Sequence, residues 1–153
     1  MTQQKIKTCL WFDGNGLEAA EFYVSVFKDS AITRITPGPS GAALVVAFRL
    51  AGVDFLALNG GPQYRFNEAV SLSVDCRSQE ELDELWEKLS AGGSRGRCGW
   101  LKDRYGLSWQ IVPSILPKLL AGADRGRVRR VVDALMGMSK LDIRALEAAA
   151  DAA

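Results

Sequence analysis

The sequence predicts an α+β protein built from two βαβββ modules and a C-terminal helical extension. Three observations support this fold class. The same order of patterns, one strand, one helix and three strands, occurs twice along the 153 residues. Each predicted strand alternates apolar and polar residues, and each predicted helix has apolar residues at helical spacing. After Pro113 only helical spacing remains, which predicts the extension.

The first module is predicted to span about residues 5–62. Its first strand ends at a glycine-rich turn, after which Asn15 and Glu18 have the spacing of a helical capping box. Apolar residues at positions 20, 23, 24 and 27 then indicate a helix. Turn-forming Pro and Gly residues separate three further strands. The predicted strands are Ile6–Phe12, Ala31–Thr36, Ala43–Leu50 and Val53–Asn59.

The second module is predicted to span about residues 66–113 and follows the same order. Ser78 and Glu81 form a second capping box, and Gly92 ends the helix that follows. The apolar stripe of this helix consists of Leu82, Leu85, Trp86 and Leu89. The predicted strands are Glu68–Asp75, short extended segments at Arg95–Cys98 and Trp100–Lys102, and a final strand at Leu107–Val112.

The helical extension is predicted at residues 115–153, where three groups of apolar residues have helical spacing. Asp124 and Asp142 are predicted to cap its later helices. We expect residues 1–114 to form the paired domain, with the extension packed on that domain or on a partner in a dimer.

Composition and charge favour an ordinary globular protein. Hydrophobic residues make up 48% of the chain and charged residues 24%. The net charge of +1 provides no general attraction for nucleic acid, and we interpret the arginines of the later part as a solvated face. The start of the chain lacks the apolar region of a signal peptide, and no apolar run approaches the length of about 18 residues expected of a membrane span. We therefore predict a cytoplasmic protein without a membrane or nucleic-acid partner.

The cysteines predict neither disulfides nor a zinc site. Cys9, Cys76 and Cys98 are odd in number, far apart and outside any C-x-x-C pair. The chain contains no histidine. Reduced thiols are therefore expected.

Several motifs, in order, resemble the vicinal oxygen chelate superfamily, to which glyoxalase I, bleomycin resistance proteins and extradiol dioxygenases belong. The resemblance is closer to its PhnB-like branch, many members of which are labelled 3-demethylubiquinone methyltransferase. The motifs are Leu10-Trp-Phe-Asp-Gly14, Ala57-Leu-Asn-Gly-Gly-Pro62, Phe66-Asn-Glu68, Cys98-Gly-Trp-Leu101 and Gly106-Leu-Ser-Trp-Gln-Ile-Val-Pro113. The resemblance implies that the two modules form a cupped mixed sheet, with helices outside and a divalent metal in the cup.

The resemblance implies four metal-ligand positions, near Lys7, Leu56, Ala69 and Gln110. These residues do not provide the three or more oxygen or nitrogen donors that a catalytic cation needs. A register one residue away would place Glu68 inward instead of Ala69, which gives at best a weak site for a hard ion. We therefore predict no metal and no other cofactor.

Candidate ligand-binding residues are those expected on the inner faces of the strands. Gln110 can orient a carbonyl or hydroxyl group of a ligand; the alternative is a structural amide. Trp11 and Trp100 can stack on a flat ligand, whereas Trp86 and Trp109 are expected in the core. The remaining candidates, for each of which the alternative is a small or inert buried residue, are Ser71, Ser73, Ser108 and Cys9. Glu68 is the candidate general base; the alternative is an ordinary charge at a strand end.

These residues favour a protein that binds an apolar or aromatic small molecule in a metal-free cup. The resemblance implies a homodimer. One alternative is an enzyme, either a lyase or isomerase with Glu68 as base or the methyltransferase of the family label. The sequence lacks the alternating βα pattern and glycine-rich loop of the common methyltransferase fold. The other alternative is a protein-interaction role for the basic C-terminal helices.

Overall fold

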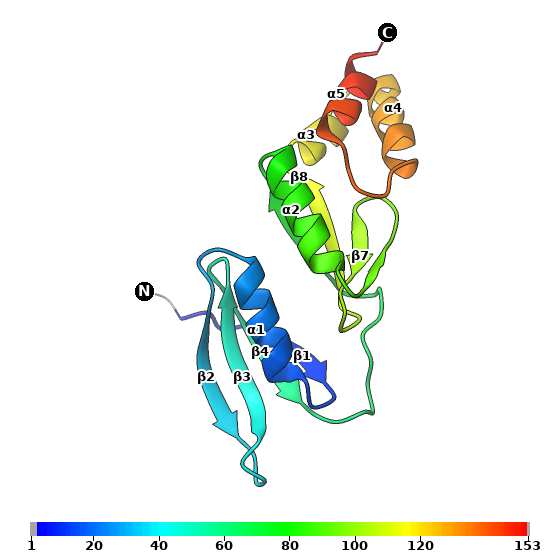
Figure 1. The fold of residues 1–153 in the computed structure, drawn as a ribbon. Coiled ribbons are helices and arrows are strands. Elements are labelled where there is room, and N and C mark those ends of the chain that lie inside the picture. The colour runs from blue at the N-terminus through cyan, green and yellow to red at the C-terminus, as the bar shows by residue number, and fades with distance from the viewer. Residues whose placement is uncertain (1–2, 153) are drawn as a thin grey trace. The chain divides into compact units, whose positions relative to one another are not determined.

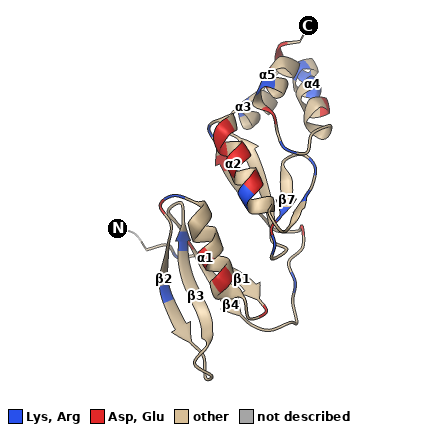
Figure 2. Cartoon of the chain, viewed as in Figure 1, with Lys and Arg blue, Asp and Glu red and all other residues tan. Residues whose placement is uncertain are grey.

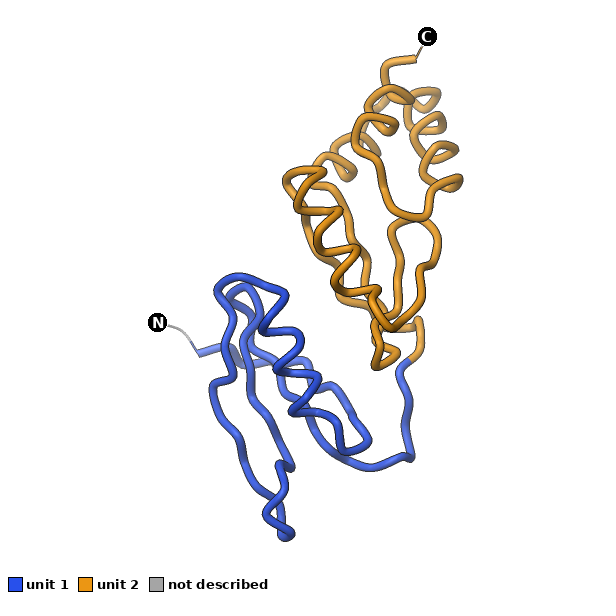
Figure 3. Tube along the Cα trace, viewed as in Figure 1, with its two compact units in different colours: residues 1–66 blue, residues 67–153 orange. Residues whose placement is uncertain are grey.

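The computed structural model describes residues 3–152 and divides into two compact units, residues 1–66 and residues 67–153 (Figures 1 and 3). The first unit contains the first βαβββ module, and the second contains the other module together with the helical extension. The predicted fold class is confirmed. None of the described helices combines the length and apolar character needed to cross a membrane.

The first unit has one helix on one face of a mixed four-stranded sheet. Its elements are β1 (Thr8–Phe12), α1 (Gly16–Val26), β2 (Ala31–Pro37), β3 (Ala43–Leu50) and β4 (Val53–Asn59). The strand order is β1-β4-β3-β2, with β1 parallel to β4 and the other pairs antiparallel. The core lies between α1 and the sheet, where Tyr23, Phe48 and Phe55 are buried and their rings pack in series.

The second unit repeats this arrangement. Its module consists of β5 (Ser71–Cys76), α2 (Gln79–Ser90), β6 (Ser94–Arg95), β7 (Trp100–Lys102) and β8 (Ser108–Pro113), in the strand order β5-β8-β7-β6. The predicted apolar stripe of α2 is buried, and Trp86 and Trp109 lie in the core as expected. Asp103 is also buried, because its carboxylate accepts hydrogen bonds from the backbone of Tyr105 and Leu107 and from the Trp109 indole.

The helical extension packs on the second module of the same chain. It consists of α3 (Leu116–Leu120), α4 (Arg125–Met136) and α5 (Ile143–Asp151), and Asp124 and Asp142 cap the latter two as predicted. The Gln79 side chain of α2 bonds to Leu141 O and Ile143 N, which ties the extension to the module. Figure 2 shows the basic residues on α4 and the acidic residues on α2.

Several local predictions were wrong. The strand predicted from Ile6 begins at Thr8, and the extended segment predicted at Arg95–Cys98 is the short strand Ser94–Arg95. Asn15 precedes α1 but makes no side-chain capping bond; instead Asn59 of β4 accepts the hydrogen bond from Gly16 N at 2.8 Å. Of the second predicted capping box, the Ser78 cap forms, with Glu81 N donating to Ser78 Oγ at 3.1 Å, but the Glu81 carboxylate accepts from Arg77 N instead of Ser78 N. The strand predicted to begin at Glu68 begins at Ser71, because residues 68–70 form a turn. A cap from a distant strand replaces the local cap in the first module.

Candidate functional site

The two modules share one register, which allows each residue on the open sheet face of one to be matched to a residue of the other. Leu56 of β4 pairs with Cys9 on β1 and Ala47 on β3. Gln110 of β8 pairs in the same way with Ser73 on β5 and Trp100 on β7. Gln110 is therefore equivalent to Leu56, in agreement with the positions that the resemblance implied.

The same register changes one of the four implied metal-ligand positions. Lys7 is two residues before Cys9, so its equivalent is two residues before Ser73, which is Ser71 and not Ala69. The expectation failed because residues 68–70 form a turn rather than extending β5. The corrected set of four is Lys7, Leu56, Ser71 and Gln110.

Ser71, at the start of the edge strand β5, and Gln110, on the neighbouring strand β8, lie together on the open face of the second sheet. Gln110 Nε2 donates a hydrogen bond to Ser71 Oγ at 2.9 Å, which holds the amide in one orientation. This bond uses one of the two amide N–H donors, so the other N–H and the carbonyl oxygen remain suited to a ligand. Both side chains are half-buried. Gln110 pairs in register with Ser73 on one side and with Trp100 on the other, and the three residues project to the same face by strand alternation.

Ser108 differs from the other serines of this face because it is fully buried. Its hydroxyl has no hydrogen-bond partner within residues 3–152. A buried hydroxyl without a partner has lost its bonds to water and gained none in return, which is unfavourable. Ser108 pairs in register with Ser71 and with Lys102 of β7.

Lys102 is the functional candidate that the sequence analysis missed. It forms an ion pair with Glu68, and both side chains are largely exposed. The hydrogen bond from Lys102 lowers the pKa of Glu68, so this carboxylate is ionised and is a weaker base than an unpaired glutamate. The signal was the alternation from Trp100 to Lys102, which places both on one face of β7.

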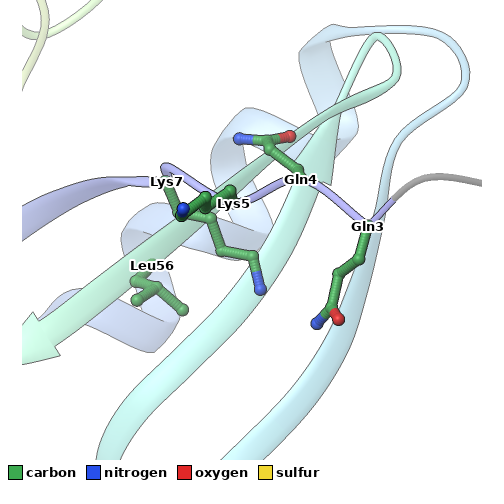
Figure 4. Close-up of a pocket in the computed structure, with 5 residues that line it drawn as sticks. All are labelled: Gln3, Gln4, Lys5, Lys7 and Leu56. Atoms are coloured by element: carbon green, nitrogen blue, oxygen red, sulfur yellow. The ribbon is translucent and has the colours of Figure 1, made fainter.

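The open face of the first sheet has a different character. Lys7 and Leu56 help to line an open hollow of about 490 Å³, together with Gln3, Gln4 and Lys5 (Figure 4). The predicted first and second metal-ligand positions are thus brought together, but they provide an amine and an alkyl group. Burial raises the pKa of the nearby Cys9 thiol, which disfavours the nucleophilic thiolate.

Trp11, a predicted stacking residue, is held by the loop that follows β4. Its indole Nε1 donates to Gly61 O at 2.9 Å, and its ring contacts Tyr64 edge-on at 4.9 Å between centroids. A Cβ atom at Gly60 would lie 2.3 Å from the ring, so the backbone itself packs on the indole. These contacts leave Trp100 as the better placed of the two tryptophans for stacking on a ligand.

The corrected donor set does not fit the divalent metal of the superfamily. Lysine and leucine offer no ligand to a hard cation at neutral pH, and a neutral hydroxyl and amide are weak ligands. Within residues 3–152, no group of three or more His, Cys, Asp or Glu side chains is placed to hold a metal ion. Glu68, the alternative ligand, is engaged with Lys102.

Residues 4–112 match the family model described as 3-demethylubiquinone-9 3-methyltransferase. A solved PhnB protein from Bacillus cereus, provisionally named as such a methyltransferase, is 33% identical, with a TM-score of 0.68 over 72% of this chain and 99% of its own. The chain belongs to this PhnB-like family. This match confirms the PhnB-like resemblance seen in the motifs.

More distant structures share the fold of this PhnB-like chain. A glyoxylase/bleomycin resistance protein/dioxygenase domain from Frankia is 16% identical, with a TM-score of 0.52 over 74% of this chain and 93% of its own. The fosfomycin resistance protein FosX from Listeria monocytogenes is 19% identical, with a TM-score of 0.55 over 80% of this chain and all of its own. No curated protein matches the chain.

Proposed function

We propose that this PhnB-like protein binds a flat, oxygen-bearing small molecule on the open face of β5, β8 and β7, without a metal ion. The observation that supports this proposal is the Gln110 amide, held by Ser71 and paired in register with Trp100. A side-chain amide fixed in orientation beside an indole provides hydrogen bonds to a carbonyl or hydroxyl group and a surface for a ring.

The contrast with the first module supports a binding role for this face. If Gln110 only filled a position in the sheet, the alkyl group that the first module has at Leu56 would serve equally well. A half-buried amide such as that of Gln110 destabilises the fold less when it forms hydrogen bonds with Ser71 and with a ligand. Binding by shape, stacking and a few hydrogen bonds needs no catalytic cation.

The test exchanges the two equivalent residues. Ligand-observed NMR would screen a library of flat hydroxylated and carbonyl-bearing aromatic compounds against the wild-type protein, Gln110→Leu and Leu56→Gln. We expect ligands that bind the wild type and Leu56→Gln but lose at least about tenfold in affinity for Gln110→Leu, since a hydrogen-bonded site rejects binding that leaves its partner unpaired. An empty screen, or equal binding to Gln110→Leu, would contradict the proposal.

The second candidate is the methyltransferase of the family name, which the match of residues 4–112 favours. The helices and strands of residues 3–152 lack the alternating βα order of the common S-adenosylmethionine-binding fold. Its best candidate base, Glu68, is paired with Lys102 and has a lowered pKa. Calorimetry with S-adenosylmethionine separates the two functions: we expect no heat of binding, and micromolar affinity would favour the methyltransferase.

We also propose the homodimer that the family resemblance implies. Native mass spectrometry of freshly purified protein measures the subunit count and any retained ligand together. A mass of one chain at micromolar concentration would contradict the dimer without bearing on the ligand site.

A further inference from the structure

We propose that the second module binds an ionised oxygen of its ligand at Lys102, and that this oxygen takes the place of the Glu68 carboxylate. The inference rests on the proposed function, because it specifies the charge of the ligand for the same sheet face. It follows from a comparison of two equivalent pairs of residues.

In the first module, a cation on β3 is neutralised within the sheet. Arg49 Nε lies 2.8 Å from Asp54 Oδ1, and Arg49 Nη2 lies 3.4 Å from Asp54 Oδ2. The two residues are register partners on neighbouring strands, so the side chains start close together. This arrangement gives the cation of the first module a carboxylate partner on the neighbouring strand.

In the second module, the cation remains but its carboxylate partner in the sheet is missing. Lys102 is at the position of Arg49, and Ser108 is at the position of Asp54. The replacement leaves a lysine beside a hydroxyl that is buried and has no partner in the described part of the chain. An ammonium and an O–H are both hydrogen-bond donors, so the pair suits an anionic oxygen.

The carboxylate that reaches Lys102 in this structure comes from outside the sheet. Glu68 belongs to the turn of residues 68–70, and 59% of its side chain is exposed. Exposed ion pairs contribute little to stability, because both groups are well solvated when apart. Glu68 is therefore a partner that an incoming anion can displace at small cost, and it lies in a turn, whereas Asp54 lies on the strand next to its cation.

The positions on β7 and β8 define the kind of ligand. Trp100 and Lys102 lie on the same face two residues apart, a separation of about 7 Å along an extended strand. Gln110 lies beside Trp100, and Ser108 lies beside Lys102. A flat ring stacked on Trp100, with a neutral oxygen at Gln110 and an ionised ring oxygen toward Lys102, fits these positions. The ligand class is an aromatic enolate or phenolate.

The experiment compares two probes that share one ring system. The probes are 4-hydroxycoumarin, which is ionised at neutral pH, and 4-methoxycoumarin, which has no ionisable group. Isothermal titration calorimetry at low salt would measure both with the wild type, Lys102→Met and Glu68→Gln. The matched controls from the first module are Arg49→Met and Asp54→Asn.

We expect the wild type to bind the hydroxy compound more tightly than the methoxy compound. Lys102→Met should lose about tenfold in affinity for the anion alone, because a charge-assisted bond is lost. Glu68→Gln should gain up to about fivefold, because no exposed ion pair has to be broken. Both control variants should bind like the wild type.

The outcomes separate this inference from the function on which it rests. Equal affinity for the two coumarins, or an anion affinity unchanged in Lys102→Met, would overturn the inference and leave the neutral site intact. If the wild type and Glu68→Gln bind neither coumarin at millimolar concentration, the inference also fails, whereas the proposed binding function fails only if the library screen is empty or Gln110→Leu binds equally. Circular dichroism of each variant verifies that the fold is retained.

Discussion

The two modules have the same strand order and register, but they resemble each other on only one of their two sheet faces. On the face that packs against the helix, both modules have large buried apolar groups, such as Phe55 in the first and Trp109 in the second. On the open face, the position of Leu56 in the first module is occupied by Gln110 in the second, and the position of Asp54 is occupied by Ser108. Because the strand register is the same in both modules, these differences between equivalent open-face residues do not alter the sheet.

The difference teaches where the physical constraints on this chain lie. A close-packed interior resists changes of volume, so the helix-packing faces remain apolar in both modules. The open faces have no such constraint, so their residues differ between the two modules. The predictions below test how far the two modules differ, from the largest expected effect to the smallest.

Asp103→Ala is expected to have the largest effect on stability. The first module has no equivalent of this buried carboxylate. Its hairpin between β3 and β4 turns through Ala51 and Gly52 alone, both at positive φ. In the second module the variant leaves three donors without their acceptor, including the Trp109 indole. We expect a loss of about 3 kcal/mol in the free energy of unfolding, measured by urea denaturation.

Two comparisons check this result. Asp103→Asn retains one carbonyl oxygen and should lose less stability than Asp103→Ala. Asp54→Ala removes only an exposed ion pair and should change the midpoint far less. A similar loss for Asp54→Ala would show that the two hairpins depend on their carboxylates equally.

Gly60→Ala is expected to affect the first module next most strongly. The added Cβ would meet the Trp11 ring at 2.3 Å, so the indole or the loop must shift. We expect about 2 kcal/mol of destabilisation, as for other overpacked sites. Gly122→Ala is the control, because open space surrounds that position. If Gly60→Ala leaves the midpoint of urea denaturation unchanged, the Trp11 ring can move, and Trp11 is again a candidate for stacking on a ligand.

The helix caps provide a finer comparison. Asn59→Ala removes two long-range bonds, to Gly16 N and to Ala43 O, whereas Ser78→Ala removes one local bond. We expect losses of about 2 and about 1 kcal/mol in the respective free energies of unfolding. Equal losses would mean that the bond to Ala43 contributes nothing measurable.

The smallest effect at neutral pH is expected at Cys76, which is equivalent to Phe12 of the first module. Burial, followed by the charges of Glu81 and Asp75, raises the pKa of this thiol from 9.0 to about 12. The folded state thus keeps the proton longer than the unfolded state. The resulting stability is complete below pH 9 and is lost as the pH rises toward 12.

Urea midpoints between pH 8 and pH 10.5 test this sign. The wild type should lose stability over this range more steeply than Cys76→Ala, which has no thiol to titrate. Identical slopes for the two proteins would show that the thiol ionises normally in the folded state.

The sequence predicted those features that depend on local pattern. The bounds of β3, β4 and β7 agree with the prediction, because alternation and turn residues define them. The start of β5 was wrong, since Val70 continues the alternation but lies in a turn and is 62% exposed. The Asn67 side chain accepts a bond from Ala69 N there, which favours the turn over the strand.

The candidate site was only partly predictable, because its decisive features are pairings between strands. Gln110 and Ser71 were named from parity, but their bond depends on the register of β5 with β8. The role of Asn59 as the cap of α1 likewise requires β4 to lie beside the helix. Lys102 was missed as a binding candidate because this role follows from its equivalence to Arg49, and that equivalence depends on strand pairing that the sequence pattern alone does not define.

The contacts of the helical extension have a consequence for the dynamics of the second unit. Leu141 and Leu146 are fully buried, and a Cβ at Gly99 would lie 3.1 Å from the Leu141 side chain. The backbone of Cys98 and Gly99 also bonds to Met138 and Ser139. Amide hydrogens in α5 and in the loop before β7 should therefore exchange with solvent through one shared opening, so the extension and the module form a single cooperative folding unit.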